Sequence, residues 1–418
     1  MASPAPTCSP DAAPTPPFPD APAALPCGPD ASPKVEAQAT LPDHLTEEIL
    51  LRLPTAADLA RASMAGPSLR RVVTDHSFLR RFRTLHPPPL LGILSDPFLP
   101  AQPPHPSAAA ARTLAGTDFS CSFLPSREQP WILHDFRDGR ALLCTAPTPD
   151  DHCLVRDVAV CDPLHRRYLL LPPVPQDLSD LVYHWELFLA PAGGDEGPAD
   201  APFRFRVMCL AKYQTQLLIF VFSSSGPHAG QWHTVAFDGW SALIAGIVDN
   251  VRSSTVFGKR YYAHRCFCWE IPRINKLLML DIATMEFSSV DLPPGPQDRQ
   301  VAFVEAREGG LGMFAVSHNH LFYSISGSPP RLWQMEDVFP LSRDHAYYII
   351  GVAGGYLLLH RFQDEPDLYP LSEMPDPDCF SLNLQTMKLE RFCGTELMMP
   401  LQGPLYAGIP PSLSPPTI

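Results

Sequence analysis

The sequence predicts an α+β multidomain protein, in which a small N-terminal helical module precedes an all-β, propeller-like domain. Three observations predict this fold class. The 418 residues include 51 prolines, a share that excludes long helices over most of the chain. Apolar residues recur at helical spacing within residues 41–86. From about residue 113 onward, short apolar runs are bounded by Gly, Pro, Asp and Asn, as β-strands are.

Composition and charge limit the classes of function. Hydrophobic residues make up 45% of the chain, enough to bury a core. The net charge of −13 argues against a general affinity for nucleic acid or anionic membranes. No apolar run approaches the roughly 18 residues of a membrane span, and the N-terminus does not resemble a secretory signal. We therefore expect no nucleic-acid or membrane partner, and reduced cysteines in the cytoplasm and/or nucleus.

The first forty residues hold eleven prolines and almost no aromatic or β-branched residues. Such a composition cannot offset the entropy lost on ordering. We expect residues 1–40 to be a disordered Pro/Ala-rich tail.

Residues 41–86 predict four short helices. Asp43 can cap the first, in which Leu45, Ile49 and Leu53 (or Leu50) recur at helical spacing until Pro54 stops it. A second, alanine-rich helix ends before Gly66-Pro67, a third follows, and Asp75 caps a fourth. So small a module holds little core, so we expect one of its surfaces to bind a partner.

The remaining chain divides into three parts. Residues 87–112 form a second proline-dense stretch, which predicts an extended linker. Residues 113–406 predict the β domain, and 407–418 a C-terminal tail. The expected strands are Ala141–Thr145, Val155–Val160, Tyr168–Leu171, Phe203–Leu210, Leu217–Phe222, Trp232–Phe237, Tyr261–Glu270, Lys276–Asp281, Val301–Glu305, Met313–Ser317, His320–Ile325, Tyr347–Val352, Gly355–His360 and Phe380–Leu384.

Three segments of the β domain repeat one pattern, a strand ending in Asp or Asn, a turn, and a second apolar strand. They are 160–172, 280–293 and 382–392, and the last two share Thr-Met in the turn. Units that recur every 40–50 residues are typical of propeller blades such as kelch and WD repeats. The degenerate repeats leave the number of blades open.

The helical module resembles the F-box, which docks on the Skp1 subunit of Skp1–cullin–F-box ubiquitin ligases. The resemblance rests on two Leu-Pro pairs one helix apart, the Glu48-Ile49-Leu50 core, and a closing Phe78-Leu79-Arg80-Arg81 segment. Leu69 stands where F-boxes commonly carry an aromatic residue. The β domain resembles the kelch-like, F-box-associated propeller of plant F-box proteins in the stretches Val160–Pro163, Tyr168–Pro173 and Tyr262–Trp269.

The resemblance implies that the chain is the substrate-recognition subunit of such a ligase. Its partners would be a Skp1-like adaptor, a cullin bound through that adaptor, and an unknown protein substrate. Residues 41–86 hold seven arginines and five acidic residues, a balance that suits docking on an acidic adaptor. The alternative for each docking residue is packing within the module itself. The residues expected to bind Skp1 are Leu41, Pro42, Leu45, Ile49, Leu50, Leu53, Pro54 and Leu59.

Signatures of catalysis and of cofactor binding are missing. The sequence has no Gly-x-Ser-x-Gly, His-Glu-x-x-His or phosphate-binding Gly-x-x-x-x-Gly-Lys motif, and its carboxylates are scattered. Cys266-x-Cys268 and His318-x-His320 could each present two metal ligands, but neither completes a tetrahedral set. We therefore expect an adaptor subunit without catalytic residues, cofactor or metal. Core packing is the preferred interpretation of Trp131, Trp232, Trp240, Trp269 and Trp333 over a ligand cage.

Two other functions stay open. The chain could be a scaffold that binds Skp1 without a cullin, or its propeller could bind a small molecule or act as an enzyme, because fold does not fix function. Segments 191–202 and 365–378 are rich in acidic residues, with glycine in the first and proline in both, and we expect them to be loop insertions.

Overall fold

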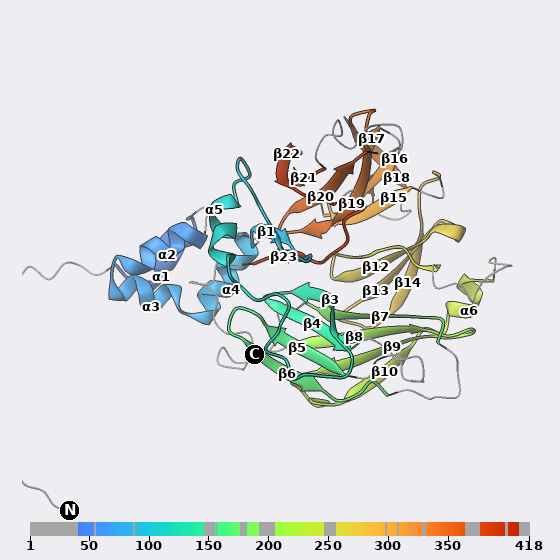
Figure 1. The fold of residues 1–418 in the computed structure, drawn as a ribbon, viewed down its shortest axis with the longest axis horizontal. Coiled ribbons are helices and arrows are strands. Elements are labelled where there is room, and N and C mark those ends of the chain that lie inside the picture. Colours follow the sequence, from blue (N-terminus) through green and yellow to red (C-terminus); the bar gives the residue numbers. More distant parts are fainter. Residues whose placement is uncertain are drawn as a thin grey trace, which may run out of the picture. The chain divides into compact units, whose positions relative to one another are not determined.

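The computed structural model describes residues 41–53, 56–86, 88–145, 155, 157–175, 182–191, 205–245, 256–296, 299–306, 309–317, 319–327, 332–363, 377–397 and 400–408. The expected tail 1–40 lies outside these residues, as do most of segments 191–202 and 365–378. Residues from Asp43 onward form one compact unit, which holds all the described elements. The fold is mostly β, with a helical segment at its start (Figure 1).

Four short helices begin this unit. Helix α4 is capped by Asp75, whose carboxylate accepts hydrogen bonds from the backbone N–H groups of Ser77 and Phe78 at 2.8 and 3.0 Å. Helix α3 begins at Pro67, directly after the extended Gly66. The helices are α1 (Asp43–Leu50), α2 (Ala56–Met64), α3 (Pro67–Val73) and α4 (His76–Leu85).

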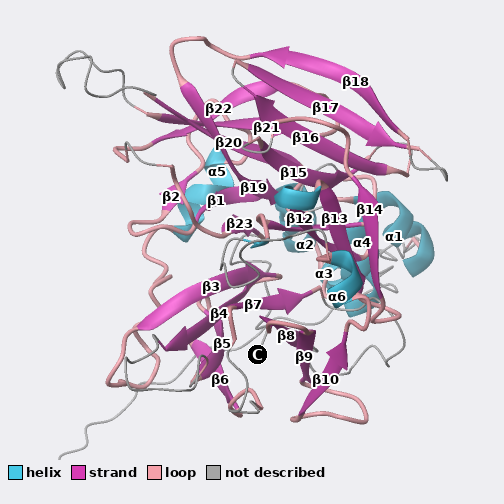
Figure 2. Ribbon diagram, turned by 90° about the vertical axis from the view of Figure 1, so that its right-hand side faces the viewer, coloured by secondary structure: helices cyan, strands magenta, loops and turns pink. Residues whose placement is uncertain are grey.

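Five four-stranded antiparallel sheets follow, each built from consecutive strands. With a sixth, three-stranded sheet they make a six-bladed β-propeller, as Figures 1 and 2 show. The strands of blades 1 to 5 are β3 (Trp131–Arg137), β4 (Arg140–Thr145), β5 (Val158–Asp162) and β6 (Arg167–Leu171); β7 (His184–Ala190), β8 (Arg206–Lys212), β9 (Leu217–Ser223) and β10 (Trp232–Ala236); β11 (Arg260–Ala263), β12 (Cys266–Ile271), β13 (Lys276–Asp281) and β14 (Phe287–Asp291); β15 (Gln300–Glu305), β16 (Leu311–Ser317), β17 (His320–Ser326) and β18 (Trp333–Pro340); and β19 (Ala346–Ala353), β20 (Tyr356–Phe362), β21 (Asp378–Asn383) and β22 (Leu389–Gly394).

Blade 6 joins the two ends of the β domain. Strand β1 (Leu90–Ile93) pairs with β2 (Leu99–Pro100) on one side and with the C-terminal β23 (Leu405–Ala407) on the other. The expected linker 87–112 therefore needs correction, because its apolar Leu90–Ile93 run is fully buried in a blade. The same segment also contains helix α5 (Ala108–Ala111).

The first strand of each of blades 1 to 5, and β23 of blade 6, lie at the centre of the ring. There β3 contacts β7, β11 contacts β15, β15 contacts β19, and β23 contacts both β19 and β3. Apolar clusters fill the space between adjacent blades, for example Phe188 of β7 against Phe267 of β12, with ring centroids 4.7 Å apart. Helix α6 (Trp240–Leu243) adds the fully buried Trp240 to the same cluster.

The repeated sequence pattern corresponds to one structural unit, the hairpin between the third and fourth strands of a blade. In blade 3 the Asp281 carboxylate accepts hydrogen bonds from the N–H groups of Ala283 and Thr284, and Met285 has a left-handed backbone, with φ 59°. In blade 5, the Asn383 side chain accepts the equivalent two hydrogen bonds, and Met387 has the left-handed backbone. The spacing from Asp or Asn to the left-handed residue is what the repeat encodes.

One expected strand is two strands. The run 261–270 is interrupted by His264 and Arg265, both with positive φ, which make a tight turn between β11 and β12. Apolar residues continue on both sides of this turn, so the sequence shows no break. Strands β3, β7, β18 and β23 were missed as well.

Candidate functional site

The outward face of helix α1 is apolar. Leu45 and Ile49 lie four residues apart, so they share one face of the helix, and they are 45% and 56% exposed. The opposite face carries Thr46 and Leu50, which are buried. Exposed leucine and isoleucine on a helix whose other face is already packed make this a candidate protein-binding surface. We call Leu45 and Ile49 the α1 face.

The residues expected to bind Skp1 divide into two groups. Leu41 and Pro42 are exposed like the α1 face, whereas Leu50 and Leu59 are buried and Leu53 is partly buried. The buried residues hold the helices together, which is the internal-packing alternative. Pro54 lies outside the described residues. The core of the module consists of Leu50, Leu51, Leu59, Val72, Val73, Phe78 and Phe82, with Leu53 and Leu69 packed against it.

Surface ion pairs and a histidine link α1 to the later helices. Arg71 of α3 lies 2.7 Å from the Asp43 carboxylate, and Arg81 of α4 contacts both Glu47 and Glu48 at 3.0 and 2.9 Å. His86 Nε2 lies 2.8 Å from the carbonyl oxygen of Leu51. The ion pairs are exposed, so each contributes little to stability. They leave the α1 face uncovered and surround it with charge, as is typical of a protein interface.

The centre of the propeller contains a charged group that joins three blades. The Arg260 guanidinium of β11 lies 3.1 Å from Asp135 Oδ2 of β3 and 2.6 Å from Glu186 Oε1 of β7. Its plane also lies over the ring of Phe188, 4.2 Å from the centroid. We call Asp135, Glu186 and Arg260 the inner ion cluster.

Hydrogen bonds complete the inner ion cluster. Asp135 accepts from the backbone N–H groups of Phe136 and Leu189, and Glu186 accepts from the Trp269 indole at 2.8 Å. Both carboxylates are thus matched by several donors, as buried charges require. No sequence signal identified this cluster, since its three residues come from three different blades.

Two further charged side chains near the centre have shifted pKa values. Desolvation, together with the nearby Arg260, lowers the pKa of Lys259 to about 8; its ammonium donates to the carbonyl of Ile350. Desolvation raises the pKa of Glu270 to about 7, opposed by Arg299 at 3.9 Å. Groups that titrate near neutrality occur at functional sites but also in structural ion pairs.

A cysteine–histidine pair in blade 1 has the geometry but not the electrostatics of a nucleophile. Cys144 Sγ lies 3.0 Å from His134 Nε2. Burial raises the pKa of the thiol to about 12 and lowers the pKa of the imidazole. The thiolate needed for nucleophilic attack is therefore not populated at neutral pH.

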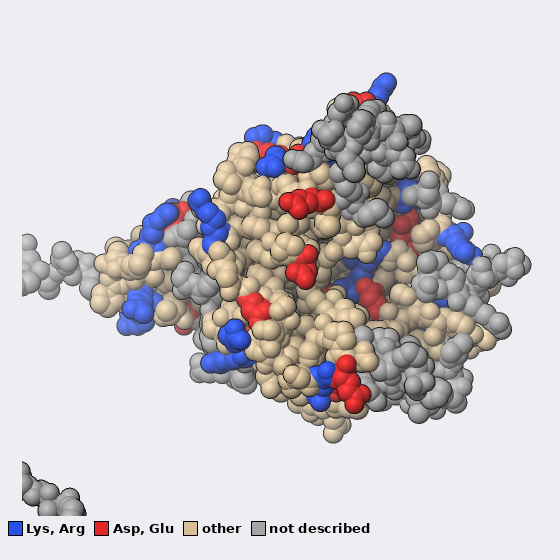
Figure 3. Space-filling model, in the orientation of Figure 1, with Lys and Arg blue, Asp and Glu red and all other residues tan. Residues whose placement is uncertain are grey.

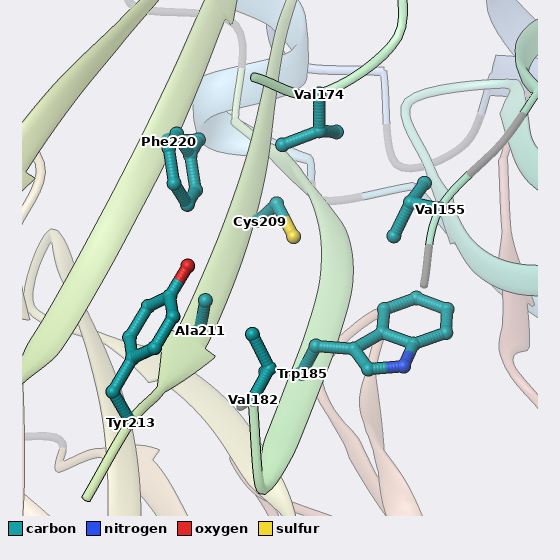
Figure 4. A pocket seen from close by; sticks show the side chains of 8 residues that line it. All are labelled: Val155, Val174, Val182, Trp185, Cys209, Ala211, Tyr213 and Phe220. Atoms are coloured by element: carbon teal, nitrogen blue, oxygen red, sulfur yellow. The ribbon is translucent and has the colours of Figure 1, made fainter. Parts of the chain in front are cut away.

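The pocket between blades 1 and 2 is apolar and small (Figure 4). It has room for about one water molecule, so it is no site for an organic ligand. Its lining is Val155, Val174, Val182, Trp185, Cys209, Ala211, Tyr213 and Phe220.

The residues considered as metal ligands or as a ligand cage are used in other ways. Cys268 is buried in the core beside the partly buried Cys266, and His318 lies outside the described residues. Within the described ranges no three His, Cys, Asp or Glu side chains are placed to hold a metal ion. The indole N–H groups of Trp131, Trp232, Trp269 and Trp333 donate to Pro125, Pro172, Glu186 and Asp291, and Trp240 is fully buried.

None of the described helices is long and apolar enough to cross a membrane.

No protein-family model and no curated protein matches the chain. Solved structures similar to it include a luciferin-regenerating enzyme, at 10% identity and a TM-score of 0.34 over 68% of this chain and 81% of that one. An oligogalacturonate lyase in complex with manganese is 8% identical, with a TM-score of 0.32 over 64% and 66%. A post-proline cleaving enzyme from Rickettsia typhi is 7% identical, with a TM-score of 0.34 over 62% of this chain and 36% of that one.

These neighbours correct one expectation. The missing catalytic motifs led us to expect an adaptor that is not an enzyme, yet proteins named as enzymes are similar to this chain. The inner ion cluster shows that charged side chains from separate blades meet without any short sequence motif.

Proposed function

We propose that the chain is a substrate-recognition subunit of a Skp1–cullin–F-box ubiquitin ligase. Helices α1–α4 dock on a Skp1-like adaptor, the adaptor binds the cullin, and the propeller binds the target protein. The F-box resemblance of residues 41–86 suggests this role. The observation that carries it is the α1 face, where two large apolar side chains stay exposed on a helix already packed on its other side.

The charge of the helical module supports the same partner. Basic side chains project from the helices on the face seen in Figure 3, and Arg61 and Arg71 are about 70% exposed. The module holds more arginines than acidic residues, an excess that favours fast association with an acidic adaptor.

The proposed mechanism is proximity. By holding a target near a ubiquitin-loaded enzyme, the receptor raises the effective concentration of the target's lysines around that enzyme. The chain's own contribution is therefore two binding surfaces, one on the helices and one on the propeller.

The α1 face can be tested by coexpressing the full chain with Skp1 and measuring the complex by size-exclusion chromatography. The double variant Leu45→Glu/Ile49→Glu should abolish the complex, because it places two charges in an apolar interface. Leu85→Glu is the matched control, since Leu85 is a 60% exposed leucine at the end of α4, and it should leave the complex intact.

Two outcomes would contradict the proposal. If the folded wild-type chain forms no complex with Skp1, the docking role of the module is wrong. If Skp1 binds but a cullin does not join the complex, the chain is a scaffold outside the ligase.

A further inference from the structure

Strand β6 is an unusually apolar sheet edge. It pairs with β5, and within the described residues it forms the outer edge of blade 1 (Figure 1). Tyr168, Leu169 and Leu170 are 40–42% exposed. Because successive side chains of a strand point to opposite faces, apolar groups are exposed on both faces of this edge.

The outer strands of the other four-stranded blades are different. Each carries polar or charged residues within the strand, and β18 and β22 also contain a register shift. Charges and bulges of this kind keep a sheet edge from pairing with other chains. The ladder between β5 and β6 is regular, and after the charged Arg167 at its first position the strand has no polar residue from Tyr168 to Leu171. The polar residues of the other strands include His233 and Thr234 in β10, Ser288 and Ser289 in β14, Glu336 and Asp337 in β18, and Glu390 and Arg391 in β22.

We propose that β6 is a docking strand, to which a short extended segment of a partner protein adds as a fifth, antiparallel strand of blade 1. Backbone hydrogen bonds would provide affinity, and the exposed leucines and tyrosine would select apolar side chains on the partner. The inference does not depend on what the helical module binds. If the ligase role holds, the segment belongs to the target protein.

The size of the surface favours a short peptide as the occupant. Three partly exposed side chains offer far less area than the roughly 1,200–2,000 Å² of a stable interface between folded proteins. Pro172 and Pro173 follow the strand, and proline cannot donate to a ladder. The Pro172 carbonyl also accepts a hydrogen bond from the Trp232 indole at 2.8 Å, which fixes this end of the edge. Pairing is therefore limited to about the length of β6.

Charge at the other end sets the direction of the segment. Arg166 directly precedes β6, its side chain is 61% exposed, and its nearest carboxylate, Asp118, is 4.0 Å away. An antiparallel segment brings its C-terminal end to this position. The segment should therefore alternate apolar and small polar residues and end in acidic ones.

The test uses the full chain and one defined probe, an acetylated peptide of three Val-Thr pairs followed by two glutamates. We expect binding, measured by fluorescence anisotropy, and slower hydrogen exchange of the amides of residues 167–171. Leu169→Lys should weaken binding about tenfold or more. Val338→Lys is the matched control on the outer strand β18, where Val338 is equally exposed, and it should bind like the wild type. A peptide with proline at its centre should not bind.

Three results would overturn the proposal. One is unchanged exchange of the β6 amides at a saturating peptide concentration. Another is equal binding by Leu169→Lys, confirmed with Leu170→Glu, in protein whose thermal unfolding is unaltered. The third is a wild-type dimer that Leu169→Lys dissociates, since the occupant would then be a second copy of the chain.

Discussion

The helical module and the propeller centre both join separate elements with arginine–carboxylate pairs, but in opposite environments. Arg71 and Asp43 are 69% and 60% exposed, whereas Arg260 and Asp135 are 11% and 12% exposed. Water screens the first pair and is largely excluded from the second. The arginine–carboxylate pair therefore contributes little to the stability of the module. The propeller depends on its pair, because an unmatched charge there has no access to water.

The largest effect in this comparison is expected for Arg260→Ala. It leaves the Asp135 and Glu186 carboxylates without their shared cation, and removing one partner of a buried pair costs about 3–5 kcal/mol. We expect a loss in the free energy of unfolding at the lower end of this range, because Glu186 is partly exposed. Urea denaturation followed by tryptophan fluorescence would measure it, and a loss below about 1 kcal/mol would show that the cluster is solvated.

An intermediate effect should appear with pH at Glu270. Its pKa is raised to about 7 in the folded chain, well above the 4.3 of an unfolded glutamate. The folded state therefore holds a proton that the unfolded state has lost between these values, so this group's stabilisation falls as the pH rises from about 4.5 through 7.

Glu270→Gln isolates that dependence. Between pH 5 and 7.5 the wild type should lose roughly 1–3 kcal/mol of stability relative to this variant. Parallel pH dependences of the two proteins would mean that Arg299 keeps Glu270 ionised in the folded state.

The smallest effect is expected for Arg71→Ala, at most about 0.5 kcal/mol. The Asp43 carboxylate stays hydrated when Arg71 is removed, so thermal unfolding should barely change. Added salt should reduce the difference between variant and wild type further. A loss near that of Arg260→Ala would remove the contrast between the two regions.

Local features of the sequence predicted much of the fold. The Asp75 cap and the prolines that bound the helices act within a few residues, as does the turn from Asp281 to Met285. Strand β7 was missed because its first three residues are polar or amphipathic. Outer strands such as β18 were missed because they are solvated and lack a clear apolar alternation.

The candidate sites were less predictable, because burial and contacts between distant elements decide them. Helical periodicity identified Leu45 and Ile49 as apolar positions of α1, but burial decided that they face outward while Leu50 packs inward. The inner ion cluster depends on contacts between blades, which no local pattern encodes.

The pairing of β1 with β23 sets the order of events during synthesis. Ile93 leaves the ribosome long before its partner Leu405, which is made after every other described strand. The nascent chain can fold individual blades as their hairpins emerge, but it must hold Leu90–Ile93 unpaired with β23 until Leu405–Ala407 have been made. During that interval the apolar side chains of Leu90–Ile93 lack the cover that β23 gives them in the finished ring.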